Sequence, residues 1–269
     1  MPIDAYLGIG VALAALAAGE MSLPGARGGG KAGRMAAVTA GTGLLAVTCG
    51  LGWQAWRDGV WPGGTAAQAL LMLAGAALGW WLWPANRHKR FASAALLLGA
   101  AAAGIGGGAS AWLTPVQAPA AQGGNWLFGV RSLLAAIGSA GWLLVLAGST
   151  TGLCRAAGPR PETGEGDHPE HAALRMVYPW LSAALLAGGV WSLAAYAVPW
   201  RGAPAELWLA IAWLVGAMYL HTPSEAPPPE APPSTAQRPR LGAWPLTALA
   251  AAGLLAAVLS AALAASLLG

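Results

Sequence analysis

Charged side chains are scarce in this chain of 269 residues. Asp, Glu, Lys and Arg together make up 9% of it, whereas apolar residues make up 57%. Soluble domains carry about 25% charged residues. A helix on a soluble surface also needs a polar face, and the stretch 245–268 has almost none. The composition therefore excludes a soluble globular protein and predicts an all-α integral membrane protein.

Cysteine is nearly absent as well. The chain has two cysteines, Cys49 and Cys154, and no C-x-x-C motif. We expect them near opposite faces of the bilayer, too far apart for a disulfide, which needs Cα atoms within about 7 Å. Thiol redox chemistry is therefore not indicated.

The usual catalytic constellations are also missing. No predicted span holds paired carboxylates, and the chain has no H-E-x-x-H motif. The run Gly106-Gly107-Gly108 follows no strand and precedes no Lys-Ser/Thr pair, so it is not a phosphate-binding loop. We expect no catalytic activity of the chain's own. The formal net charge of +4 is interpreted as a topology signal and not as a nucleic-acid surface.

Long apolar stretches dominate what is present. A helix of about 20 residues crosses the ~30 Å hydrocarbon core of a bilayer. Eight stretches are long enough or nearly so, and we expect them to form one polytopic domain over 1–269: 3–21, 35–54, 66–84, 92–113, 125–149, 176–198, 205–221 and 244–268.

The basic residues predict an orientation. Cytoplasmic loops of membrane proteins are rich in Lys and Arg. Eleven of the 14 basic residues fall in four alternate loops, and the other three are Arg57, Arg131 and Arg201. This bias places both termini outside and two long loops, 155–175 and 222–242, in the cytoplasm. The second loop is a proline-rich tether.

The segment 188–221 carries the most specific pattern in the chain. It reads GGVWSLAAYAVPWRGAPAELWLAIAWLVGAMYLH, a span, a short aromatic loop and a second span that ends in histidine. It resembles, without a gap, the tryptophan-rich segment of the cytochrome c assembly family (CcsA/ResC type, with CcmC as a relative), which runs roughly G-x-I-W-A-x-x-A-W-G-x-Y-W-x-W-D-P-K-E-T-W-x-L-I-x-W-L-x-Y-A-x-Y-L-H. The positions kept are Gly188, Trp191, Trp200, Pro204, Glu206, Trp208, Trp213, Leu214, Ala217, Tyr219, Leu220 and His221.

Several motif positions are changed. Two motif tryptophans fall at Tyr196 and Gly202, the aspartate at Ala203 and the lysine at Ala205. The family's first outer histidine would fall at about Arg131. The chain thus resembles a degenerate member. The resemblance implies haem handling in a bacterial cytoplasmic membrane, with a second membrane protein as assembly partner and c-type cytochromes as acceptors.

His221 is the predicted axial ligand for one haem b, since it matches a transmembrane haem-ligand histidine of the family. A lone histidine at the membrane surface is otherwise only a polar anchor. Tyr219 and Trp213 lie on neighbouring turns, and the basic loop Arg87–Arg90 is a candidate for holding haem propionates. His88 is expected to be solvated in a cytoplasmic basic turn. His168 and His171 lie in a cytoplasmic loop, and their spacing could bind a metal, although two ligands in a flexible loop are weak support for a metal site.

The outer side has its own candidates. Trp200 and Trp208 are either a platform for a porphyrin or part of the ordinary aromatic belt at the membrane surface. Arg131 either meets a haem propionate or a lipid phosphate, or extends its charge to the interface. We expect these three side chains to form a shallow aromatic recess without iron, because no histidine lies on that side.

Two functions fit the sequence. The first is a haem-handling protein for cytochrome c biogenesis. The second is a non-catalytic subunit of a respiratory or photosynthetic electron-transfer complex, packed against lipid and other membrane subunits, with or without haem b. The missing motif residues favour the second, whereas the family resemblance favours the first.

Overall fold

The computed structural model describes residues 3–22, 29–59, 61–83, 90–113, 126–156 and 169–221, together with four isolated positions between 248 and 255. Within these residues the protein is built of helices without strands, as the composition predicts. The helices are α1 (Ile3–Ser22), α2 (Gly29–Asp58), α3 (Ala66–Leu82), α5 (Arg90–Leu113), α6 (Trp126–Ala156), α7 (Pro169–Tyr196) and α8 (Pro204–Leu220).

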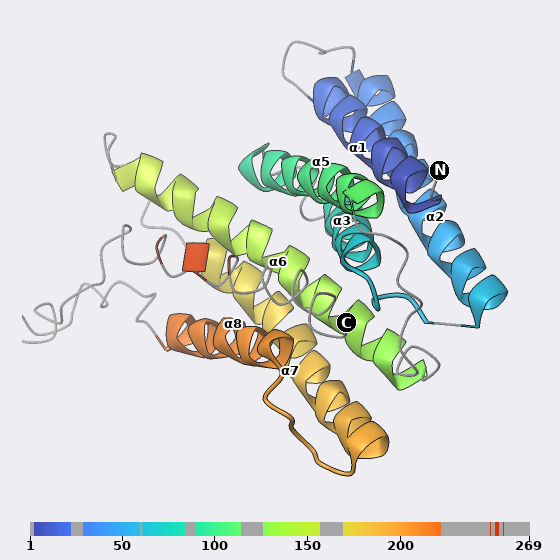
Figure 1. The fold of residues 1–269 in the computed structure, drawn as a ribbon. Helices are drawn as coiled ribbons and strands as arrows, with labels where there is room; N and C mark the ends of the chain where they lie inside the picture. Colours follow the sequence, from blue (N-terminus) through green and yellow to red (C-terminus); the bar gives the residue numbers. More distant parts are fainter. Residues whose placement is uncertain are drawn as a thin grey trace, which may run out of the picture.

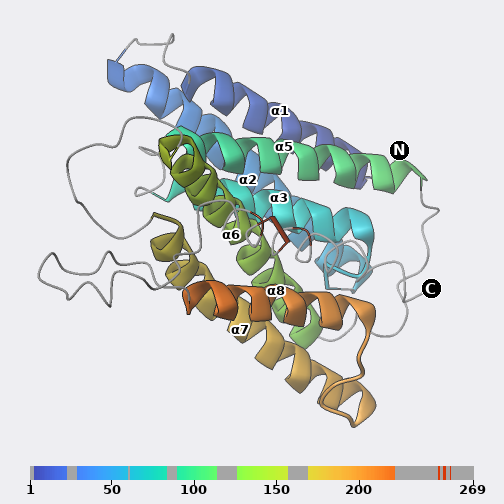
Figure 2. The ribbon, with the colours of Figure 1, turned by 90° about the vertical axis from the view of Figure 1, so that its left-hand side faces the viewer.

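The helices form two groups that meet at α6. Helices α1, α2, α3 and α5 pack against one another, whereas α7 packs closely on α6 and α8 packs on α7. Helix α6 also contacts α3 and α5, so it lies between the two groups (Figure 1). The view in Figure 2 shows the same division, with α7 and α8 together on one side of α6.

Small residues let the helices approach closely. A Cβ added to Gly104 of α5 would lie 2.9 Å from the carbonyl oxygen of Gly8 in α1. A Cβ on Gly107 would lie 3.2 Å from the carbonyl oxygen of Ala67 in α3. The glycine run 106–108 therefore serves helix packing, as small residues do in membranes. Between α6 and α7, the side chain of Leu181 packs against Gly138.

Five described helices are long and apolar enough to cross a membrane: α1, α2, α5, α6 and α7. Helices α3 and α8 are apolar but shorter, at 17 residues each, or about 25 Å. With the composition, these helices make the chain a membrane protein. The eighth expected stretch, 244–268, lies almost wholly outside the described residues, so the count of eight stays a prediction.

The two long loops differ in what the structure describes. Helix α6 continues to Ala156, and α7 begins at Pro169, so the connection is shorter than the expected 155–175. Proline at the first helical position is typical, since its missing N–H has no helical partner there. The other loop, 222–242, lies outside the described residues.

Candidate functional site

The motif segment forms the end of α7, a short loop and α8. Helix α7 ends at Tyr196, and Ala197 follows in the left-handed conformation, with φ of 58°. The N–H of Ala197 still donates to the carbonyl oxygen of Leu193 at 2.9 Å, which closes the last turn. The chain then runs back towards α7, because a Cβ on Gly189 would lie 3.4 Å from the carbonyl oxygen of Pro199.

Arg131 lies in the first turns of α6 and is buried, with 8% of its surface exposed. Its guanidinium carbon is 5.2 Å from the ring centroid of Trp191 on α7, a cation–π contact. A Cβ on Gly188 would lie only 3.2 Å from Nε of Arg131, so the motif glycine makes room for this side chain. Arg131 is therefore packed inside the protein.

Aromatic rings surround the same point. Trp191 is 4% exposed, and its ring lies 5.3 Å from Phe128 of α6 and 5.4 Å from Tyr196. The guanidinium carbon of Arg201 lies 4.0 Å from the ring centroid of Tyr196. Trp191 and Tyr196 are thus the rings next to Arg131. The sequence did not indicate that either ring lies near Arg131.

Glu206 completes this group. It lies in the first turn of α8 and is 4% exposed. Its Oε2 accepts the N–H of Ala203 at 3.3 Å, and its carboxylate suits the positive end of the helix. Glu206 also acts electrostatically on Arg131. Ser192 follows Trp191 on α7 and is fully buried. We use the name Arg131 recess for the set of residues Arg131, Trp191, Ser192, Tyr196 and Glu206.

The motif tryptophans have different surroundings. Trp200 is 41% exposed in the loop after α7. Trp208 is partly buried against the hydrophobic core. Trp213 donates its indole N–H to Oγ of Ser182 at 2.9 Å and stacks on Tyr178, with ring centroids 5.5 Å apart. Trp213 thus binds α8 to α7, which is a packing role.

His221 is the C-cap of α8, and its side chain is exposed. Its backbone N–H donates to the carbonyl oxygen of Ala217 at 3.1 Å. It lies at the opposite end of α8 from Glu206. The sequence-predicted site residues therefore divide between the two ends of α7 and α8, with Arg131 at one end and His221 at the other.

A second buried polar group lies near the His221 end. Tyr219 is fully buried, and its hydroxyl lies 2.8 Å from Oγ of Ser149 on α6. Oγ of Ser149 also donates to the carbonyl oxygen of Val145 at 2.9 Å. The ring of His171 lies 5.0 Å from the ring of Tyr219. We call Ser149, His171 and Tyr219 the Tyr219 cluster.

His171 corrects an expectation from the sequence. We expected a loop residue, whereas the structure places it in the first turn of α7 with 2% exposure. The signal was the spacing of His171, Leu174, Val177 and Leu181, which repeats every three or four residues and marks one helix face. The neighbouring His168, like His88, lies outside the described residues, and so does most of the loop Arg87–Arg90.

No group of three or more His, Cys, Asp or Glu side chains that could hold a metal ion occurs in the described part of the chain. Axial ligation of haem needs fewer side chains, since the porphyrin supplies four nitrogens. His221 fits that need as an exposed imidazole at a helix end. Cys49 is a free, exposed thiol.

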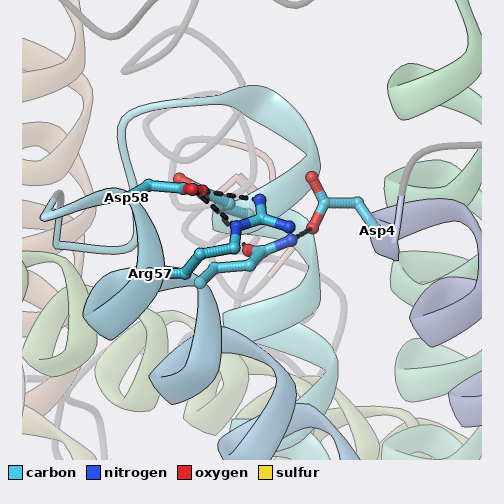
Figure 3. A network of polar contacts seen from close by, with 5 residues as sticks. Asp4, Arg57 and Asp58 are labelled. Atoms are coloured by element: carbon cyan, nitrogen blue, oxygen red, sulfur yellow. Dashed lines mark hydrogen bonds and ion pairs between the residues drawn. The ribbon is translucent and has the colours of Figure 1, made fainter.

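A further polar network joins α1, α2 and α3 (Figure 3). Nε2 of Gln54 donates to Oδ1 of Asp4 at 2.5 Å. Gln68 donates to Gln54 at 3.4 Å, and Arg57 pairs with Asp58 at 2.6 Å. The loop before α3 extends this end to α6, where Trp61 packs on Gly129. The ends of α1, α2, α3 and α6 that the basic residues predict to be on the outer side thus lie together.

Comparison with known proteins finds short matches to one kind of protein. No protein-family model and no solved structure matches the chain. The cytochrome c biogenesis protein CcsA of Thermosynechococcus vestitus is 36% identical over 55 residues, which is 20% of this chain and 17% of that protein. CcsA of Marchantia polymorpha is 36% identical over 58 residues, or 22% and 18%. CcsA of Chlamydomonas reinhardtii is 42% identical over 45 residues, or 17% and 13%.

These matches span less than a fifth of the length of each relative. They agree with the resemblance noted from the motif, in which some positions are kept and others are lost. The relatives come from cyanobacterial, plant and algal sources. The chain is therefore a membrane protein with a weak, partial similarity to CcsA.

Proposed function

We propose that this chain is a haem-handling membrane protein of the cytochrome c assembly type. The observation that carries the proposal is the gapless motif segment 188–221 together with its structure. Its kept residues Gly188 and Trp191 lie against Arg131, Glu206 acts on Arg131 electrostatically, and the last residue of the segment, His221, is exposed. The similarity to CcsA proteins supports the same function.

Haem is cargo in this proposal. His221 holds the iron from the end of α8, and the basic residues Arg87–Arg90 are the proposed partners of the propionates. Bound haem supplies an iron centre and a flat apolar ring. The protein's own part is to hold the imidazole at the membrane surface, to anchor α8 on α7 through Trp213, and to keep the surrounding helices packed.

The proposal includes an orientation. Eight spans with both termini outside, in a bacterial cytoplasmic membrane, place the Arg131 recess outside and His221 at the inner surface. The partners are then a second membrane protein of the assembly system and c-type cytochromes as acceptors. Reporter fusions after Pro161 and Pro229 should both give a cytoplasmic signal, and a periplasmic signal at either position contradicts the orientation.

Haem content tests the function directly. The full chain is purified in mild detergent, and its haem is measured by the pyridine haemochrome spectrum. We expect one haem per chain or less, with a Soret band that His221→Ala abolishes while the protein stays in the membrane. A matched control is His171→Ala, whose ring is buried against Tyr219 and should affect stability and leave the Soret band in the folded fraction.

Two results would change the assignment. A wild-type protein that purifies without haem favours the alternative function, a structural subunit of an electron-transfer complex. Full haem in His221→Ala removes the ligand assignment and leaves the rest of the proposal standing.

A further inference from the structure

The Arg131 recess contains a buried cation that lacks a close counter-ion. Arg131 is 8% exposed, and no carboxylate among the described residues lies within ion-pair distance of it. Glu206 acts on it electrostatically but forms no ion pair with it. A charge removed from water is costly unless it is paired, and intramembrane arginines almost always have partners. Binding of a negatively charged group next to Arg131 is therefore favoured.

Three buried donors in the recess also lack acceptors. Nε1 of Trp191, Oγ of Ser192 and Oη of Tyr196 are inaccessible to solvent and have no hydrogen-bond partner in the described part of the chain. Trp191 and Ser192 are 4% and 0% exposed. An indole N–H can only donate. Buried polar groups almost always have partners, so three unsatisfied groups around one cation need an explanation.

The positions of these donors agree with a single site. Trp191 contacts both Arg131 and Tyr196. Ser192 lies one turn after Gly188 on the helix face that meets Arg131. Arg201 adds a second guanidinium over the ring of Tyr196, on the exposed side. With Glu206, the fixed charges amount to two positive and one negative, so one anion would balance them.

We infer that the Arg131 recess binds an oxyanion, the carboxylate or phosphate group of an amphiphile in the membrane. The planar guanidinium of Arg131 matches either group through paired N–H···O bonds. The Trp191, Ser192 and Tyr196 donors then bind the remaining lone pairs. Water also accepts hydrogen bonds, but it brings no charge to neutralise Arg131. The inference is independent of iron, because the recess contains no imidazole.

The two sources of an oxyanion are distinguished by matched probes. Metal-free protoporphyrin IX carries two carboxylates on a flat ring, and its dimethyl ester carries none. Phosphatidic acid and diacylglycerol share acyl chains and differ by the phosphate. Binding of the first pair to the detergent-purified full chain is measured by porphyrin fluorescence, and binding of the second pair by native mass spectrometry.

We expect at least one acid to bind about tenfold more tightly than its neutral analogue, as hydrogen bonds to a charged group are worth about that factor or more. Preference for the porphyrin acid identifies a carboxylate ligand, and preference for phosphatidic acid identifies a phosphate ligand. Arg131→Gln should abolish the preference. The inference is overturned if neither acid is preferred, or if the preference survives Arg131→Gln.

Tyr196→Phe and Ser192→Ala test the site without altering its charge. Each substitution should lower the affinity for the preferred acid roughly tenfold. Each should leave the melting temperature of the ligand-free protein unchanged or raise it, since each removes an unsatisfied buried group. The control Tyr6→Phe lies on α1 with 60% exposure and should change neither value. Lower ligand-free stability with unchanged affinity would show a structural role and overturn the inference.

Failure here and failure of haem binding are separable. The oxyanion probes contain no iron and report on the Arg131 recess, whereas the haemochrome spectrum reports on His221 at the other end of α8. If the protein binds haem but prefers neither acid over its neutral analogue, the proposed function stands and the oxyanion inference is overturned.

Discussion

Polar side chains are buried near both ends of helix α7, and the hydroxyl groups of the two places differ in whether they have hydrogen-bond partners. In the Tyr219 cluster, the hydroxyl of Tyr219 meets Oγ of Ser149 at 2.8 Å, and Ser149 is bonded in turn to Val145. In the Arg131 recess, the indole of Trp191 and the hydroxyls of Ser192 and Tyr196 meet no partner within the described residues. Both groups are buried at a junction of α6, α7 and α8.

The difference separates structure from function in a chain with few polar residues. A satisfied buried hydroxyl stabilises the fold by about 1 kcal/mol, while an unsatisfied one costs about 1–3 kcal/mol. The Tyr219 cluster therefore acts as an internal bond between α6 and α8. The unsatisfied groups of the Arg131 recess destabilise the isolated chain. Such groups are usually found where a ligand or a partner offsets the destabilisation.

Of the substitutions predicted here, the one that removes the charge of Glu206 should have the largest effect on stability. Glu206→Gln keeps the shape and the acceptor for Ala203 but removes the negative charge that acts on Arg131. We expect a loss of about 2 kcal/mol in the free energy of unfolding, less than for a buried pair in direct contact. The measurement is an SDS-unfolding titration of the detergent-purified protein.

The same variant should bind an oxyanion more tightly, because one competing negative charge is gone. Stability and affinity then change in opposite directions. Glu20→Gln on the exposed surface of α1 is the control and should change stability by less than about 0.5 kcal/mol. An unaltered unfolding curve for Glu206→Gln would show that Arg131 does not depend on this carboxylate.

Tyr219 and Tyr196, whose hydroxyl oxygens are both buried, form a matched pair for the second prediction. Tyr219→Phe should lower the free energy of unfolding by about 1–2 kcal/mol, because it breaks the bond to Ser149. Tyr196→Phe should leave the ligand-free stability unchanged or raise it. Thermal unfolding of both variants, followed by tryptophan fluorescence, checks the contrast, and equal losses would remove the distinction between the two ends.

The two buried serines repeat the contrast with a smaller change. Ser149→Ala removes the oxygen that Tyr219 meets and should cost about 1 kcal/mol. Ser192→Ala, in the Arg131 recess, should have no cost in the ligand-free protein. Amide hydrogen exchange across α7 is a suitable measurement, with faster exchange near His171 expected only for Ser149→Ala. Faster exchange in both variants would indicate that Ser192 has an unseen structural partner.

Much of the fold was predictable because the relevant signals are local. Low charge and long apolar stretches predicted a helical membrane protein, and the helix bounds agree with seven of the expected stretches to within several residues. The largest differences fall at helix ends outside the apolar core. Helix α2 begins at Gly29 and α7 at Pro169, earlier than hydrophobicity alone indicated, because polar residues can continue a helix beyond the membrane.

The candidate site was harder to predict because it depends on which helices meet. The motif identified Gly188, Trp191 and Glu206 as kept positions, but their common neighbour, Arg131, is 57 residues before Gly188 in the sequence. Whether Arg131 is buried or exposed follows only from the packing of α6 on α7. For the same reason His171 was missed, since its partner Tyr219 lies on α8.

The smallest predicted effect on stability concerns the loop after α7. It tests whether the backbone there keeps the conformation of the family motif. Ala197 has φ of 58°, a conformation in which a Cβ crowds the following carbonyl and which glycine adopts freely. The family pattern has glycine at this position. Ala197→Gly should therefore raise the free energy of unfolding by about 0.5 kcal/mol, as the relieved strain exceeds the added entropy of the unfolded chain.

The control Ala195→Gly lies two residues earlier, inside α7 and exposed, where glycine should cost about 0.5–1 kcal/mol. Opposite signs for the two substitutions, measured by SDS unfolding, would establish that the turn after Tyr196 keeps the motif's geometry although its side chains have changed. That turn directs the chain from Tyr196 to Glu206, on either side of Arg131. If Ala197→Gly destabilises the protein as much as Ala195→Gly, the turn is not left-handed, and the placement of Tyr196 in the Arg131 recess loses its structural basis.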